Sequence, residues 1–198
     1  RLVRDAMDLA QPSKSKSGAV DAKGWPIGHF EKFAGCLETE YGRFPDKVTA
    51  LEIQPKTGTP LTLSDRTSND VFIQLLASGI GGSETYFATY SSDTRKPDGD
   101  WSSDATALEH GETSFAFVSG LSTKGNPSCP IVFGPVIPGT KILDAKSFDG
   151  KAVLLKLDNS VTSGPIDSED RIMINGFDLL DPKNPIWNGK APDIKWPK

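Results

Sequence analysis

The segment from Gly28 to Asp46 constrains the fold most, because it combines a helical apolar stripe with a clear helix ending. Its apolar residues recur at helical spacing and are Phe30, Phe33, Ala34, Leu37 and Tyr41. This spacing predicts an amphipathic α-helix. Gly42 suits the left-handed residue that ends a helix, and Pro45 prevents its continuation. Because such a helix must bury its apolar face, we expect it to pack across a sheet.

The rest of the chain reads mainly as short strands and turns, in keeping with its 19 Gly and 15 Pro. Three segments rich in β-branched and aromatic residues are the strongest strand candidates: 115–118, 131–133 and 152–157. A hairpin is predicted where Asp158, Asn159 and Ser160 lead into 161–165. Further strands are expected at 48–53, 60–63, 84–90 and 171–174.

A second helix and an extended tail complete the prediction. Thr67 to Asp70 form a capping box ahead of an apolar run, and Gly79 is expected to end that helix. The tail, residues 181–198, contains four prolines that forbid a helix or a central strand. We expect it to run extended over the surface, with Trp187 and Trp196 as anchors. The predicted fold class is therefore α+β, an N-terminal helix on a mostly antiparallel sheet, with a second short helix and long loops.

The chain divides into two parts in this interpretation. Residues 1–27 combine the remnant of an N-terminal helix, at 1–10, with a solvated flexible linker that contains Ser-Lys-Ser-Lys-Ser-Gly. Residues 28–198 form one globular domain that includes the proline-rich tail. Since the chain opens on Arg1 rather than Met, we expect that an upstream segment, able to hold a signal or a membrane helix, has been removed.

Charge and motifs exclude several functions. A formal charge of −4 and a pI near 5.2 give no basic field for phosphates, so we predict no nucleic-acid partner. The two histidines, His29 and His110, belong to no His-Glu-x-x-His motif, and the chain contains neither Gly-x-Ser-x-Gly nor a Walker loop. We therefore predict that the protein is not an enzyme and needs no cofactor. A hydrolase with paired carboxylates stays a third alternative, since sequence does not exclude carboxylates that meet in space.

Two groups of residues are candidates for binding or cross-linking. Asp93, Asp98, Asp100 and Asp104 lie in one polar loop. They offer oxygen ligands for Ca²⁺, although their spacing is not that of an EF-hand and acidic turns occur without metal. Cys36 and Cys129 match no metal spacing. They either form one disulfide in an exported protein or remain two buried thiols.

The helix ending Leu37-Glu-Thr-Glu-Tyr-Gly-Arg-Phe-Pro45 resembles that of type II secretion pseudopilins and type IV pilin-like proteins. Three later phrases resemble a branch of bacterial prepilin-like proteins with an N-terminal cleavage and methylation segment. They begin at Ser68 (Ser-Asn-Asp-Val-Phe-Ile-Gln-Leu-Leu), Phe148 (Phe-Asp-Gly-Lys-Ala-Val-Leu-Leu-Lys-Leu-Asp-Asn-Ser-Val) and Leu180 (Leu-Asp-Pro-Lys-Asn-Pro-Ile-Trp). The likeness spans most of the chain from Phe30. The family's apolar helix with its processing site is absent, the linker at 11–24 interrupts a usually continuous helix, and the calcium motif of major pseudopilins does not carry over.

This resemblance implies a structural subunit of a pseudopilus-like or pilus-like assembly. Its absent apolar helix would anchor it in the bacterial inner membrane, with the present domain in the periplasm or on the cell surface. Its partners would be other pseudopilin subunits and components of a secretion machine. The alternative is an exported, non-catalytic module that binds glycan or peptide through loop tryptophans and residues 91–104.

Overall fold

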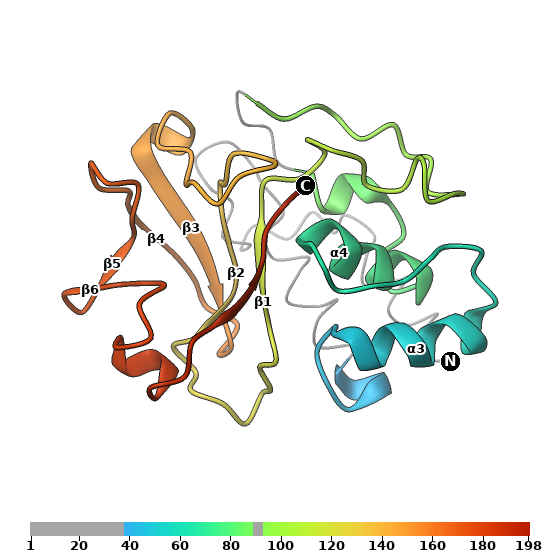
Figure 1. The fold of residues 1–198 in the computed structure, drawn as a ribbon, viewed down its shortest axis with the longest axis horizontal. Coiled ribbons are helices and arrows are strands. Elements are labelled where there is room, and N and C mark those ends of the chain that lie inside the picture. The colour runs from blue at the N-terminus through green and yellow to red at the C-terminus, as the bar shows by residue number, and fades with distance from the viewer. Residues whose placement is uncertain (1–37, 89–92) are drawn as a thin grey trace, which may run out of the picture.

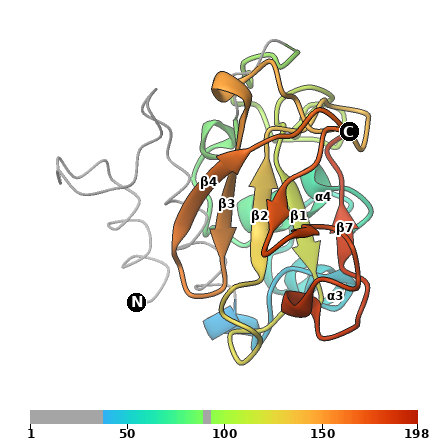
Figure 2. The same ribbon diagram turned by 90° about the vertical axis from the view of Figure 1, so that its left-hand side faces the viewer.

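The computed structural model describes residues 38–88 and 93–198 and shows a mixed α and β fold (Figure 1). Its centre is a five-stranded antiparallel sheet in the order β4-β3-β2-β1-β7. The strands are β1 (Ala116–Ser119), β2 (Pro130–Gly134), β3 (Lys151–Lys156), β4 (Val161–Pro165) and β7 (Asp193–Lys195). Figure 2 looks onto this sheet, with α3 and α4 behind its β1 and β7 side. The expected α+β class with an antiparallel sheet is confirmed.

Besides this sheet, the described chain contains two complete helices, three 3-10 turns and a small hairpin. The helices are α3 (Lys47–Thr57) and α4 (Ser68–Ala77). The single 3-10 turns are η1 (Glu84–Tyr86), η2 (Phe148–Gly150) and η3 (Pro185–Trp187). A separate two-stranded hairpin consists of β5 (Met173–Ile174) and β6 (Phe177–Asp178).

The helix predicted at 30–41 is described only in its last turn. Residues 38–41 are helical, Gly42 has φ 72° and its N–H donates to Glu38 O at 2.7 Å. This confirms the predicted ending, because a glycine without Cβ accepts the left-handed conformation at low cost. Residues 1–37, which carry the remnant helix, the linker and most of the apolar stripe, lie outside the described residues. The packing of that stripe on the sheet therefore stays a prediction.

Three aromatic rings join helix to sheet in the core. Phe72 of α4 stacks on Phe87 with ring centres 5.2 Å apart, and meets Phe117 of β1 edge-on at 6.3 Å. All three are almost fully buried. The central strands β1 and β2 are buried along their whole length, so both faces of the sheet centre are covered. Aromatic pairs of this geometry add to the free energy of burial.

The strongest sequence predictions agree with the structure. The strands expected at 115–118, 131–133 and 152–157 are β1, β2 and β3, and the hairpin turn at 158–160 joins β3 to β4. The capping box at Thr67 is formed: its side chain accepts from Asp70 N, and the Asp70 side chain accepts from Thr67 N. The strand expected at 171–174 forms only over Met173–Ile174.

Three predicted strands are wrong. Residues 48–53 lie in α3, because Asp46 and Thr49 form a reciprocal capping box that starts a helix. The buried Thr49, Ala50 and Ile53 follow a helical spacing rather than alternation. Residues 60–63 are irregular, and Thr62 N donates to the Asp104 carboxylate at 2.7 Å instead of to a strand. Residues 84–86 form η1, whose Thr85 N–H donates to the Ser83 side chain, while residues 89–90 lie outside the described residues.

The tail is more integrated than predicted. Pro185 is tolerated in η3 because it occupies the first helical turn, where its missing N–H leaves no intrahelical bond unmade. Residues 193–195 pair with β1 as the edge strand β7, which the prolines permit. Both expected anchors are found. Trp187 is 6% exposed and donates from Nε1 to Leu179 O at 2.6 Å, and Trp196 packs edge-on against Phe133.

Candidate functional site

The loop from 93 to 112 carries the densest group of charged side chains and is the candidate site. The structure does not gather its four predicted calcium ligands around one point. Asp98 accepts from Asp100 N at 2.7 Å, Asp100 from Ser102 N at 3.0 Å, and Asp104 from Thr62 N at 2.7 Å. Over residues 38–88 and 93–198, no three His, Cys, Asp or Glu are placed to hold one metal ion. These aspartates, apart from Asp93, thus cap local turns or neighbouring backbone.

The pKa values of two of these aspartates reflect such bonds. The hydrogen bonds from Ser102 lower the pKa of Asp100, and those from Thr62 lower the pKa of Asp104. Both side chains are therefore stabilised as carboxylates at neutral pH. Their negative charge is directed at backbone N–H groups of the protein itself.

Two glutamates that sequence reasoning did not single out hold this loop: Glu84 from η1, and Glu112 at the end of the loop itself. Glu84 is fully buried, and its carboxylate accepts from Leu108 N at 2.6 Å and from Gly99 N at 3.1 Å. It thereby connects η1 to two points of the loop. Burial raises the pKa of Glu84; the Leu108 bond opposes this rise, and the nearby carboxylates of Glu112 and Asp98 reinforce it.

Glu112 closes the loop at its other end. It is 1% exposed, accepts from Glu109 N at 2.7 Å and lies 3.6 Å from the Arg95 guanidinium, which also pairs with Glu109. Burial raises the pKa of Glu112, while the bond from Glu109 N and the charge of Arg95 lower it. The backbone adds one further tie, from Arg95 N to Gly111 O at 2.9 Å.

Leu108 shows how firmly this loop is held. Its φ of 36° is a conformation that side-chain-bearing residues rarely adopt, at a cost on the order of 1–3 kcal/mol. Glu84 accepts from its N–H, and the buried Asn69 of α4 donates from Nδ2 to its carbonyl at 2.8 Å. Two buried side chains from different elements therefore fix both backbone groups of one strained residue.

The chemistry of this arrangement is that of a structural anchor. Both buried carboxylates accept hydrogen bonds from loop N–H groups, and His110 in the same loop is exposed. His29, the other histidine, lies outside the described residues. Sequence reasoning missed Glu84 and Glu112 because a glutamate in a polar segment reads as a solvated surface residue, and no local motif signals its burial.

The cysteines and tryptophans were the other candidates. Cys129 is buried, its Sγ donates to Ile186 O at 3.0 Å, and burial raises the pKa of its thiol. Cys36 lies outside the described residues, so their pairing stays a prediction. Trp187 and Trp196 serve as packing anchors, and Trp101 packs partly buried against the core. These three tryptophans are thus engaged with the body of the domain.

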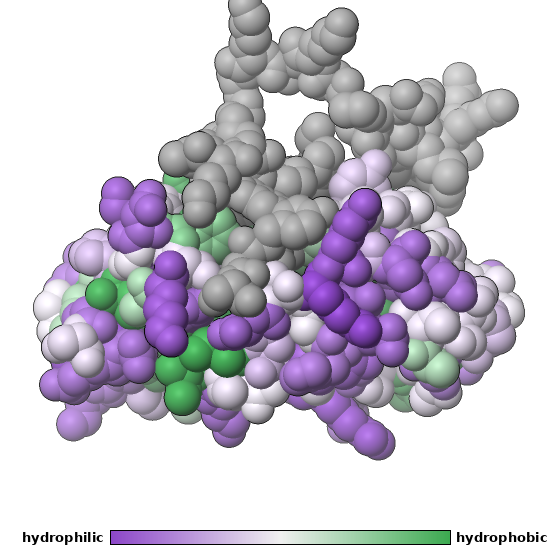
Figure 3. Space-filling model, turned by 90° about the horizontal axis from the view of Figure 1, so that it is seen from above, coloured by the Kyte–Doolittle hydropathy of each residue, from purple (hydrophilic) through white to green (hydrophobic). Residues whose placement is uncertain are grey.

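The described surface offers few apolar side chains. Figure 3 shows one face on which hydrophilic residues predominate. The large exposed hydrophobic residues of the described chain are Leu51 on α3, Ile142 between β2 and η2, Met173 on β5 and Phe177 on β6. In the described part of the chain, no helix is both long and apolar enough to cross a membrane.

The fold defines the chain as an α+β protein built around an antiparallel sheet with a buried carboxylate anchor beneath one loop. Comparison with known protein families, with curated proteins and with solved structures finds no match to this chain.

Proposed function

We propose that the protein is a structural subunit of a pseudopilus-like or pilus-like assembly, anchored in the bacterial inner membrane by a helix upstream of the present chain. Its domain would face the periplasm or the cell surface and contact other subunits. The family resemblance of the helix ending at Tyr41 and Gly42 suggests this role. A filament subunit of this kind needs a stiff joint, because load must pass between a packed helix and its globular domain.

The main observation in support of the proposal is how the last helical turn is joined to the rest of the domain. The Glu38 carboxylate accepts from both the N–H and the hydroxyl of Thr123, at 3.0 and 2.8 Å, in the turn between β1 and β2. Tyr41 packs against the core, and Lys56 of α3 lies 4.2 Å from the centre of its ring. Phe44 directly after the helix is buried. The helix end is therefore tied to both the sheet and α3.

The membrane anchor is tested on the native protein. Mass spectrometry of its mature N-terminus should find a methylated residue followed by about 20 apolar residues, the length that spans a bilayer. This form should disappear in cells that lack the prepilin peptidase. Cleavage by a general signal peptidase, or a cytoplasmic start without an apolar helix, would contradict the proposal.

The joint itself is tested by a matched pair of variants. Glu38→Ala removes both bonds to Thr123, whereas Glu40→Ala changes an exposed glutamate of the same turn. We expect Glu38→Ala to reduce subunit cross-linking in cells while circular dichroism shows an unchanged fold, and Glu40→Ala to behave as wild type. Equal assembly of the two variants would show that this joint carries no load.

A further inference from the structure

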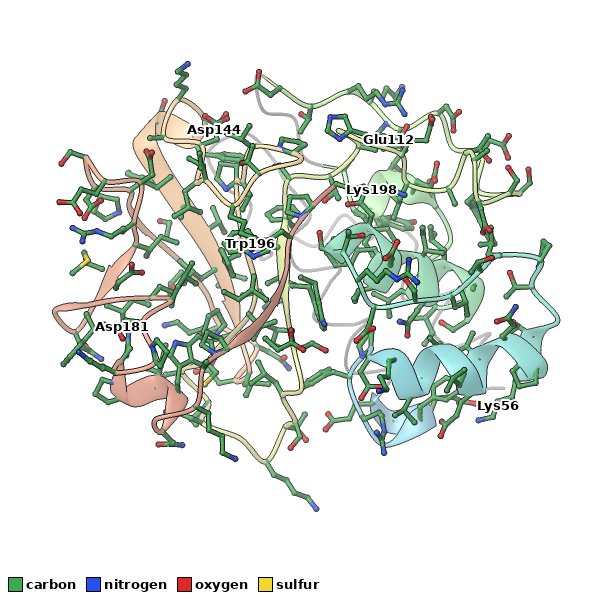
Figure 4. All side chains as sticks on the ribbon, viewed as in Figure 1. Lys56, Glu112, Asp144, Asp181, Trp196 and Lys198 are labelled. Carbon is green, nitrogen blue, oxygen red and sulfur yellow. The ribbon has the colours of Figure 1, made fainter. Side chains whose placement is uncertain are left out.

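The last six residues, 193–198, form a strap that holds separate parts of the domain together. β7 pairs with β1 through the partners Phe117 with Lys195, Val118 with Ile194 and Ser119 with Asp193. The chain then continues across the sheet toward the candidate loop. Figure 4 shows Trp196 over the middle of the sheet and Lys198 near Glu112.

Backbone hydrogen bonds tie the end of the strap to three other segments. Trp196 O accepts from Ser68 N of α4 at 3.0 Å, Pro197 O from Gly139 N at 3.0 Å, and Lys198 O from Gly111 N at 3.2 Å. Lys198 N donates to the Asn69 side chain at 2.9 Å. Most of these bonds involve backbone groups of the seat, by which we mean β1 together with Asp65, Ser68, Asn69, Gly111, Phe133 and Gly139.

Two side chains give the strap its specificity. Trp196 meets Phe133 of β2 edge-on, with ring centres 5.9 Å apart. The Lys195 ammonium, 14% exposed, lies 3.4 Å from the Asp65 carboxylate, so the charges of strap and seat are complementary. The pKa of Lys195 is raised: burial opposes the rise, but the bonds and charges of Asp193 and Asp65 outweigh it. The lysine thus keeps its charge at neutral pH.

A short exposed segment separates the strap from the preceding anchor. Trp187 is fixed in the body, while residues 188–191 are exposed. Asn188 and Gly189 both have left-handed φ values, 51° and 75°, and a Cβ added at Gly189 would meet no atom within 4 Å. Pro192 restricts Ala191 to extended conformations. Two backbone hydrogen bonds hold this turn, from Asn188 N to Pro185 O at 3.2 Å and from Lys190 N to Trp187 O at 3.0 Å. Moving the strap by rotation at residues 188 and 189 costs these bonds but leaves the Trp187 Nε1 bond to Leu179 O in place.

We propose that the strap is exchanged between copies of this chain, so that residues 193–198 of one copy seat on β1 and Phe133 of another. The exchanged strap makes the same contacts with the second copy that it makes with its own body. The free-energy cost of exchange therefore comes from rearranging residues 188–191 and from the translational and rotational entropy that the two copies lose. If the exchange is reciprocal it closes a dimer, and if it runs head to tail it links copies into a chain. It rests on the strap, hinge and seat alone, and so stands independently of a membrane anchor.

Exchange competes with the state in which the strap of each copy binds to its own domain. A short tether holds the strap at an effective concentration in the millimolar range, so exchange in dilute solution is rare and increases with protein concentration. Subunits held side by side in an assembly supply comparable local concentrations. The test must therefore trap a minor population covalently.

Cysteines placed on opposite sides of the β1–β7 pair trap it. Ser119→Cys and Asp193→Cys, whose positions are directly paired, are carried on two chains of different mass in a Cys36→Ser, Cys129→Ser background. Serine at 129 keeps a hydroxyl donor for Ile186 O. After oxidation at increasing concentration, we expect a disulfide between the two chains whose yield rises with concentration. A single chain that carries both substitutions should form an internal disulfide, which verifies that the two positions are close enough to bridge. If strain prevents the direct disulfide, a bis-maleimide cross-linker joins the same two cysteines.

A matched pair on the far edge of the sheet is the control. Thr162→Cys lies on β4, the opposite edge strand, and is exposed. Mixed with Asp193→Cys, it should report only random collision, and the strap pair should exceed it several-fold. Equal yields for the two mixtures, when the single-chain bridge forms, would overturn the exchange.

A shortened hinge provides a second measurement. Deleting Lys190 and Ala191 removes about 7 Å of reach, which we expect to disfavour seating of the strap on its own body. We expect discrete oligomers by light scattering. A folded monomer of this variant would contradict the proposal.

Discussion

The free energy of unfolding should depend strongly on Asn69, a single buried amide that joins three segments. Its Nδ2 donates to Leu108 O at 2.8 Å and to Glu109 O at 3.2 Å, and its Oδ1 accepts from Lys198 N at 2.9 Å. Asn69→Ala leaves these three backbone groups without this partner. A buried group left unpaired costs about 1–3 kcal/mol, and some of these will relax toward water. We therefore expect a loss of about 3 kcal/mol.

Urea unfolding followed by circular dichroism measures this loss, with a drop in melting temperature of roughly 6–12 °C for a chain of this size. Asn69→Asp provides a sharper comparison, because it keeps the shape but turns a negative oxygen toward two carbonyl groups. It should be at least as destabilising at pH 7 and should recover partly on acidification. The control is Gln54→Ala, an exposed position on α3, which should stay within about 0.5 kcal/mol of wild type. A loss below about 1 kcal/mol for Asn69→Ala would refute the view that this amide fixes the loop and the strap.

Three further predictions concern other parts of the domain. Thr67→Ala removes the cap of α4 and should cost about 1 kcal/mol in urea unfolding, against no change for the exposed Ser168→Ala. Because the folded-state pKa of Glu84 is raised, its contribution to stability is present below its unfolded pKa and is lost as pH rises through the folded pKa. In paired melts, Glu84→Gln should therefore gain stability relative to wild type as the pH is raised from acidic to neutral, and a constant difference would contradict this. Trp187→Phe replaces the indole by a smaller aromatic ring without the N–H and leaves Leu179 O without this partner, at a cost of about 1–3 kcal/mol; an unchanged melting temperature would show that this bond is not needed.

Local sequence signals determined those elements whose stability is itself local. The Thr67 capping box begins α4 as expected, and Gly42 ends the preceding helix because its left-handed φ is costly for other residues. The β-branched and aromatic runs became β1, β2 and β3. The Asp46 box was not recognised in the sequence, because its N3 residue is Thr49 rather than an acidic residue, and residues 48–53 were predicted to be a strand instead of α3.

Tertiary structure alone decided which polar side chains are buried and what closes the sheet. Glu84 and Asn69 look like ordinary surface residues, yet they fix the two backbone groups of Leu108 from segments 24 and 39 residues away. The tail became an edge strand because β1 offered free backbone groups on one side, and the seat for Trp196 comes from β2, which lies far away in the chain. Such contacts depend on which segments meet in space. The spacing of residues along one segment carries no record of them, and this is why the strap and the buried carboxylates appear only in the folded chain.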